Sequence, residues 1–187
     1  ASRSGAHGYR SIAQPAVLGL QRQRLGARVD YVSTRRGRAM DLSAMMQLGV
    51  AVIVATASDE GRPALTRGWG PSYDDESGVL HLSVTAPAGS PTLENLRSNG
   101  AIAVTVSEPL TYQTAQFKGV VEHVGAPSEN DRISAHQHLG RFVDDVAQLG
   151  IEEGADRLFQ GDLRVVSFAV VELYNQTPGE RAGERIR

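Results

Sequence analysis

Six short runs of apolar and β-branched residues follow residue 40, and most of the connections between them are only a few residues long. Such runs, bounded by turn residues, predict buried strands. Short connections can join only antiparallel neighbours. The order predicts a mainly β (α+β) fold, an antiparallel barrel or sandwich with peripheral helices. The predicted strands are 49–57, 64–73, 79–85, 101–107, 111–125 and 163–176.

Three segments between the strands have helical signals. Ser90 can cap free N–H groups and Pro91 suits the first helical position, while Gly100 is a natural residue after the helix end. Ser128 begins a Ser-x-x-Asp start before apolar residues at helical spacing. The predicted helices are 41–48, 90–100 and 128–149.

Two predicted strands have features that bear on a site. The strand 64–73 is interrupted by two glycines and a proline, so it is bent or lies at an edge. The strand 111–125 alternates, which places every second residue on one face. One face then carries Tyr112, Thr114, Gln116 and Lys118, and the other carries Gln113, Ala115, Phe117 and Gly119. The final residues, 177–187, are predicted to form a polar tail.

Charge is divided unequally along the chain. Residues 1–39 carry eight arginines and one acid, a net charge of +7, whereas the remainder has eleven basic and twenty acidic residues, a net charge of −9. We therefore expect a basic, flexible N-terminal extension over 1–39 and one domain over 40–187, with Met40 a plausible first residue. The acidic body argues against nucleic acid as a partner.

The STRRGRA stretch at 33–39 resembles a twin-arginine export signal. The apolar run after it continues into a turn and a second strand, so removing it would delete a core strand. We therefore expect a cytoplasmic protein with no membrane partner.

Several kinds of catalytic site are disfavoured. The chain has no cysteine, which excludes disulfides and thiolate chemistry, and Lys118 is its single lysine. No nucleophile-elbow, Walker or dinucleotide-binding glycine pattern is present. His136 and His138 are two apart on a predicted helix, so they point to different sides and do not form a metal site. His81 and His123 lie on separate strands and can meet only if the fold brings them together.

A few polar residues suggest an anion site, each with a plainer alternative. Arg67 lies in mid-strand beside Gly68 and Trp69. Two interpretations are open: an anion clamp next to a flat aromatic ring, or an exposed arginine on an edge strand. Ser90 and Thr92 begin a helix and form either a simple cap or a phosphate site. Gln116 and Lys118 on the long strand read by themselves as a solvated face.

In combination, these features resemble the pyridoxamine 5′-phosphate oxidase-like, FMN-binding split β-barrel family over about residues 41–181. HLSVTAPAGSPTLENLRSNGAIAVTV resembles that family's strand, phosphate-contact turn, helix and next strand. FKGVVEHV resembles the following strand, and LYNQTPGERAG resembles the QTPG ending of many small members.

The resemblance implies a six-stranded split β-barrel that forms a homodimer with two flavin sites at the subunit interface. It implies an FMN-dependent oxidoreductase that passes hydride or electrons to a small-molecule acceptor, with no catalytic acid or base to name. Trp69 and Tyr112 are candidates for shaping the substrate face. The implied cofactor-binding residues are Arg67, Ser90 and Thr92 at the phosphate, Trp69, Ser83, Val84 and Thr85 beside the isoalloxazine, and Gln116 and Lys118 from the long strand.

One departure from the family keeps alternatives open. Many members have a basic residue after the third strand, where this chain reads GSPT. Related barrels use deazaflavin or haem, and His81 or His123 could ligate a haem. A cofactor-free sensor or binding module is the third possibility, and it is the one that the GSPT turn favours.

Overall fold

The computed structural model describes residues 40–151, 154, 156–159 and 161–187. The predicted N-terminal extension, 1–39, lies outside these residues and stays a prediction. The strands are β1 (Ala51–Ala57), β2 (Pro63–Asp74), β3 (Val79–Thr85), β4 (Ala101–Ser107), β5 (Thr114–Gly125) and β6 (Leu163–Asn175). The helices are α1 (Leu42–Met46), α2 (Pro91–Ser98) and α3 (Glu129–Gln148), and η1 (Asp156–Leu158) is a short 3-10 helix.

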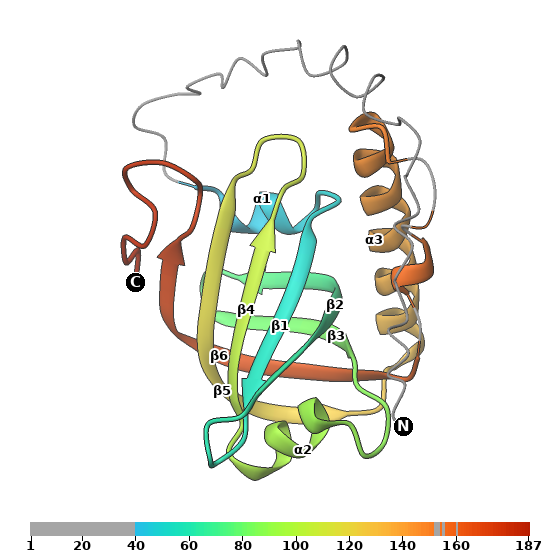
Figure 1. The fold of residues 1–187 in the computed structure, drawn as a ribbon, viewed down its shortest axis with the longest axis vertical. Coiled ribbons are helices and arrows are strands. Elements are labelled where there is room, and N and C mark those ends of the chain that lie inside the picture. The colour runs from blue at the N-terminus through green and yellow to red at the C-terminus, as the bar shows by residue number, and fades with distance from the viewer. Residues whose placement is uncertain (1–39, 152–153, 155, 160) are drawn as a thin grey trace, which may run out of the picture. The chain divides into compact units, whose positions relative to one another are not determined.

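The six strands form a closed antiparallel barrel in the order β1-β2-β3-β6-β5-β4 (Figure 1). The predicted antiparallel barrel is therefore confirmed, and the sandwich alternative is not found. Closure pairs every strand on both sides, so β2 is not an edge strand. Its predicted bend is confirmed by a register shift against β3 between Trp69 and Ser72.

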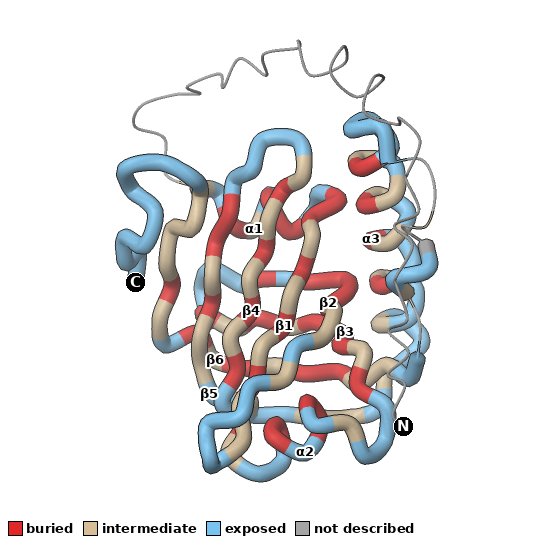
Figure 2. Tube along the Cα trace, in the orientation of Figure 1, coloured by how far each residue is buried: buried red, intermediate tan, exposed pale blue. Residues whose placement is uncertain are grey.

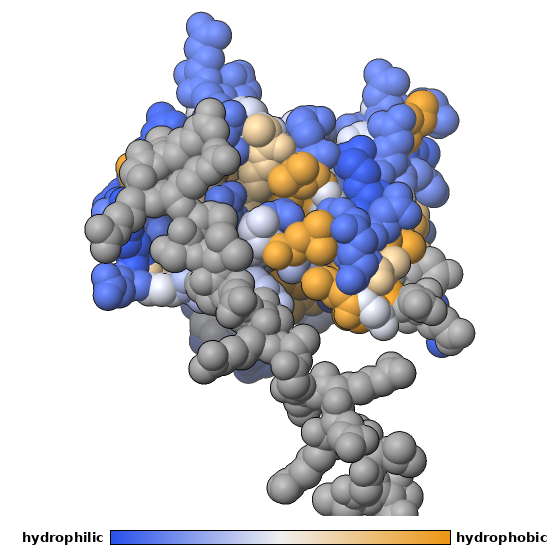
Figure 3. Space-filling view, turned by 90° about the horizontal axis from the view of Figure 1, so that it is seen from above, coloured by the Kyte–Doolittle hydropathy of each residue, from blue (hydrophilic) through white to orange (hydrophobic). Residues whose placement is uncertain are grey.

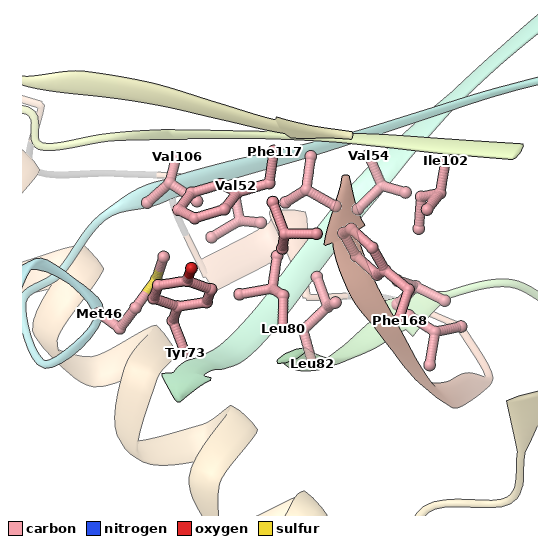
Figure 4. Close-up of a cluster of buried hydrophobic side chains, with 14 of the residues drawn as sticks. Met46, Val52, Val54, Tyr73, Leu80, Leu82, Ile102, Val106, Phe117 and Phe168 are labelled. Atoms are coloured by element: carbon pink, nitrogen blue, oxygen red, sulfur yellow. The ribbon is translucent and has the colours of Figure 1, made fainter. Parts of the chain in front are cut away.

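Alternation along the strands separates the barrel interior from its outer wall. Along β1, every second residue is buried, which is visible as alternating red and tan in Figure 2. The interior is filled by branched and aromatic side chains, among them Val54, Leu82, Phe117 and Phe168, which are all fully enclosed (Figure 4). This packing is the main stabilising contribution to the barrel.

The three helices have different places on the barrel. In Figure 1, α1 and α2 lie at its two ends, and α3 runs along one side, where it packs against β2 and β3. The predicted caps are confirmed, because the side chains of Ser90 and Ser128 each accept a backbone N–H at a helix start, and Asp41 caps α1 in the same way. Gly100 follows the end of α2 with a φ of 68°, as predicted for that position.

The structure differs from the sequence predictions at two ends of strands. β5 begins at Thr114, so Tyr112 lies in the preceding turn, where its φ is 59°. The predicted polar tail folds back along β6, and the Ile186 N–H donates to the Leu173 carbonyl at 2.7 Å. Its sequence has no apolar alternation that would predict this pairing.

A glycine marks the place where β5 and β6 lie closest. A Cβ added at Gly119 would lie 2.3 Å from the carbonyl oxygen of Ala169 and 2.6 Å from Cδ2 of Phe168. We expect Gly119→Ala to lower the free energy of unfolding by about 1–3 kcal/mol, because backbone and an enclosed ring must move. Urea denaturation followed by circular dichroism measures this change.

Gly140→Ala is the matched control. A Cβ at Gly140, on the exposed face of α3, meets nothing within 4 Å. This variant is expected to be more stable by about 0.5–1 kcal/mol, because alanine favours a helix interior. Equal stability of Gly119→Ala and the wild type would contradict the close approach of β5 and β6.

Candidate functional site

A groove of about 330 Å³ lies on the outer wall of the barrel, between β1, β2, the end of β3 and η1. Its volume is at the lower end of the range for small-molecule sites. Of the described residues in its lining, Arg67 alone is charged, with two threonines beside it and three apolar side chains around them. The lining residues are Ile53, Leu65, Thr66, Arg67, Thr85 and Leu158.

The pleat of β2 determines which residues face this groove. Gly68 points into the barrel, where an added Cβ would lie 2.6 Å from Cγ1 of Val52 and 2.8 Å from Cδ1 of Leu82. Its neighbours Arg67 and Trp69 therefore point outward. Among the described residues, Arg67 has no ion pair or side-chain hydrogen bond. Its charge is available to an anion.

Thr85 is held in the groove by two hydrogen bonds. The indole N–H of Trp69 donates to its hydroxyl oxygen at 3.2 Å, and the hydroxyl of Thr66 donates to its carbonyl at 2.5 Å. The Thr85 hydroxyl accepts in this contact, so its O–H can still donate a hydrogen bond to another group.

Trp69 lies behind the groove and is only 2% exposed. Its ring meets His138 of α3 edge-on at a centroid distance of 6.0 Å and Phe159 at 5.1 Å. His136 contacts the other side of Phe159 at 4.8 Å. The four rings join β2, α3 and the segment that carries Leu158 of the groove wall. The indole thus holds the Thr85 hydroxyl in place through its N–H, while both faces of its ring are covered by protein.

The N-terminal end of α3 is fixed to the barrel by a polar pair. His81 Nε2 lies 2.9 Å from Asp131 Oδ1, and Asp131 also forms a capping box with Ser128. Gly70, with a φ of 57°, allows close approach, because a Cβ there would lie 2.7 Å from Oγ of Ser134. These contacts hold the helix that covers Trp69.

The predicted site residues fall into separate places. Of the nine, Arg67 and Thr85 line the groove. Trp69 and Ser83 are opposite one another on β2 and β3, directly behind it, and Ser83 is 3% exposed. Val84 is fully buried in the barrel core. These placements group four of the candidates at or next to the groove.

The other predicted residues lie outside the groove lining. Ser90 caps α2 and Thr92 is 4% exposed. Gln116 is on β5, three strands from Arg67 along a row of paired residues, Arg67–Ile53–Thr105–Gln116, which is roughly 14 Å at the strand spacing of a sheet. Lys118 lies 4.9 Å over the Tyr174 ring and 3.9 Å from Glu172. One chain therefore does not bring Gln116 or Lys118 to Arg67.

The histidines that were candidates for a haem are apart from one another and from the groove. Both His81 and His123 are paired in register with Ser167 of β6, which lies between them. His81 is hydrogen-bonded to Asp131, and the His123 ring lies over Gly125. The described residues contain no group of three or more metal-binding side chains.

The barrel end at α1, away from the groove, carries exposed apolar side chains. Figure 3, a view from above, shows apolar side chains among hydrophilic ones on this face. Leu110 and Tyr112 of the β4–β5 turn are 39% and 47% exposed. In the same turn, burial and the nearby charge of Asp145 raise the pKa of Glu108. Tyr112 lies in this turn, outside the groove lining.

The sequence did not predict all of the groove. Thr66 is adjacent to Arg67 but alternates to the other side of the strand, and no motif marks Ile53 or Leu65. Leu158 and Phe159 lie in a stretch without a regular pattern. The pairing of β1 with β2, which only the fold supplies, brings Ile53 opposite Arg67.

No protein-family model and no curated protein matches the chain. Solved structures do match. HupZ of Group A Streptococcus is 14% identical, with 78% of this chain and 99% of that chain covered and a TM-score of 0.47. An F420 reductase is 19% identical, with 73% and 98% covered and a TM-score of 0.47. A pyridoxamine 5′-phosphate oxidase-related, FMN binding protein from Nostoc punctiforme is 13% identical, with 70% and 76% covered and a TM-score of 0.39.

The closed six-stranded antiparallel barrel confirms the fold that the sequence resemblance implies. Likenesses this distant carry no conclusion about a cofactor or a substrate. In the part of the chain that the structure describes, no helix has the length and apolarity to cross a membrane.

The Asp131 anchor gives a pH-dependent prediction. Burial raises the pKa of Asp131, but hydrogen bonds from Ser128 and His81 outweigh it and hold that pKa below its ordinary value. The ionised carboxylate therefore stabilises the fold above about pH 4, and this stabilisation is lost as the pH falls through the folded-state pKa. Asp131→Asn should lower the free energy of unfolding at pH 7 by about 1 kcal/mol.

Urea denaturation at pH 7 and at pH 3 measures both effects. The difference between Asp131→Asn and the wild type should be smaller at pH 3 than at pH 7, because below about pH 4 the unfolded chain takes up a proton at Asp131 more readily than the folded protein does. Asp144→Asn, on an exposed position of the same helix, is the control and should change little at either pH. A difference that grows at pH 3 would contradict the anchor.

Proposed function

We propose that the chain is an FMN-binding oxidoreductase that uses the Arg67 groove and works as a homodimer. The observation that carries this proposal is an arginine with no partner among the described residues, in an outer-wall groove whose other walls are largely apolar. A guanidinium and hydroxyls suit a phosphate, and apolar walls suit a planar ring system. The sequence resemblance to FMN-binding barrels supports the same choice.

The groove offers a flavin phosphate one positive charge, that of Arg67. Arg67 would hold the phosphate, and the Thr85 hydroxyl can donate to it. Ile53, Leu65 and Leu158 would exclude water from the ring. A bound flavin supplies hydride and electron transfer, while the chain supplies binding and orientation. Binding therefore depends strongly on Arg67, since no second basic side chain lines the groove.

The homodimer proposal rests on the outer face of β1 and β4. In Figure 1 this face is toward the viewer, with none of the described helices in front of it. Outward positions of a solvated strand are normally polar. Here Ala55 is paired with Ala103 on one side and with Leu65 on the other, and Leu65 is 71% exposed. An apolar row of this kind indicates a surface that another protein covers.

A second copy of the chain is the partner that this face suits. The apolar row lies next to the row that contains Arg67 and Gln116, so a partner on this face would border the groove. Gln116 and Lys118, too far from Arg67 within one chain, would reach a groove only across such an interface. This is the role that the family resemblance assigned to them.

The first test is FMN binding by the purified protein. After FMN is added and excess is removed by desalting, the wild type should keep the flavin absorbance bands. Arg67→Ala should raise the Kd by about ten- to a hundredfold, because a charge-assisted contact is worth about 1.5–3 kcal/mol. Titration calorimetry gives the Kd of each variant.

Arg62→Ala is the matched control, because Arg62 is an exposed arginine outside the groove lining. It should bind FMN like the wild type. A folded wild type that retains no FMN would overturn the cofactor. Reddish protein would indicate haem, and colourless protein with intact folding would indicate a binding module.

The dimer is tested separately by light scattering after gel filtration. Ala103→Arg places a charge at the β4 end of the apolar row and should halve the measured mass. Ala88→Arg introduces the same side chain in an exposed loop, and the measured mass should remain that of a dimer. A wild type with the mass of one chain would refute the homodimer without bearing on FMN binding.

A further inference from the structure

His138 is a buried polar residue that packing alone does not explain. Its side chain is fully enclosed between α3 and the barrel, and neither ring nitrogen has a hydrogen-bond partner among the residues that the structure describes. Enclosing a polar group without a partner is unfavourable, and a phenylalanine or leucine would fill the space without that penalty. An imidazole at this position therefore points to a property that an apolar side chain lacks.

The contacts of His138 lead to the groove. The imidazole meets the edge of the Trp69 ring, and the Trp69 N–H donates to the hydroxyl of Thr85. Thr85 lines the groove. The position of the Thr85 hydroxyl thus depends on the indole, and the position of the indole depends on His138.

We propose that His138 is a positioning residue for the groove: its neutral ring holds the Trp69 indole against Thr85, and protonation of that ring releases the indole and weakens ligand binding. The effect on a ligand rests on the proposed FMN site. The effect on Trp69 does not, because it concerns contacts within the chain.

The charges around His138 favour a neutral ring in the docked state. Burial and the positive charge of Arg141, one turn along α3, lower its pKa to about 4, and the nearby backbone of Val50 offsets this only in part. The charged group that β2 contributes beside Trp69 is Arg67, another cation. Among the described residues, Arg141 is the charge that acts on His138, and no carboxylate offsets it.

The nearest candidates for such a carboxylate have other partners. Asp131 is bonded to His81 from β3, and Asp145 accepts the Gly49 N–H from the segment before β1. On the segment that carries Phe159, the described charged side chains are Arg157 and Asp162, and both are exposed. Protonation of His138 would therefore place an unpaired cation in the protein interior.

The direction of the pH dependence follows. A released imidazole has an ordinary pKa of about 6.5, so the released state binds more protons than the docked state below that pH. The docked state is therefore fully favoured above about pH 6.5 and is progressively disfavoured as the pH falls toward 4. The affinity for FMN should fall in the same interval.

Trp69 reports this contact directly, because it is the single tryptophan of the chain. Between pH 7 and pH 4.5, the emission of the wild type should shift to the red and acrylamide quenching should increase, reversibly and with unchanged far-ultraviolet circular dichroism. His138→Phe should keep a blue-shifted, poorly quenched emission throughout, because the ring fills the site and cannot take a proton.

FMN titrations measure the effect on the groove. The Kd of the wild type should rise between pH 7 and pH 5, by at most the roughly twentyfold shift of the docked–released equilibrium that these two pKa values give. His138→Phe should bind as the wild type does at pH 7 and lose that dependence. His138→Ala should bind FMN more weakly than the wild type at pH 7, whereas His138→Phe, which fills the same space, should restore the affinity.

His123→Phe is the control, since His123 is an exposed histidine on β5, outside both the aromatic cluster and the groove lining. It should keep the pH profile of the wild type. The proposal is overturned if His138→Phe retains that profile, or if His138→Ala changes neither the emission nor the Kd at pH 7. Should the alanine variant not fold, the comparison of wild type with His138→Phe still decides the matter.

The two proposals fail in different ways. A wild type that binds no FMN at pH 7 would remove the proposed cofactor, while the emission series would still decide the role of His138. A wild type that binds FMN with a pH dependence unchanged in His138→Phe would keep the cofactor and remove the positioning role.

Discussion

The close packing of Gly68 inside the barrel is the constraint on which the groove depends. No room exists for a side chain there, because Val52 and Leu82 already occupy the space. With Gly68 facing inward, the strand pleat turns Arg67 and Trp69 outward. The same alternation gives the wall a cation that faces solvent and an aromatic ring that α3 can cover. Barrel packing and groove chemistry are therefore determined by one strand register.

The groove is supported from behind by a set of contacts in several layers. His81 and Ser128 fix Asp131 and with it the start of α3. That helix encloses Trp69, whose N–H fixes the Thr85 hydroxyl. The polar contacts at the start of α3 and the aromatic cluster between α3 and the barrel wall thus act on the same groove residue. This arrangement connects the titration of groups on α3 to the shape of a site that they do not line.

The apolar outer face of β1 and β4 is a second consequence of the same pairing. Alanines on adjacent strands lie side by side because β1 pairs in register with both β2 and β4. The row lies directly beside the groove, so the proposed dimer interface and the proposed ligand site share one wall. Gln116 and Lys118 have a place in the site only if a second copy covers that wall.

The sequence by itself determined the strands, the helix caps and the barrel class, because alternation, capping side chains and short turns are local signals. It also marked Arg67, Trp69 and Thr85, which lie near one another in adjacent strands. Only the tertiary structure decided which candidates meet. Ile53 and Leu158 reach the groove through strand pairing and through packing of distant segments. The pairing of the final residues with β6 and the enclosure of His138 likewise depend on contacts between residues far apart in the chain, which no local pattern encodes.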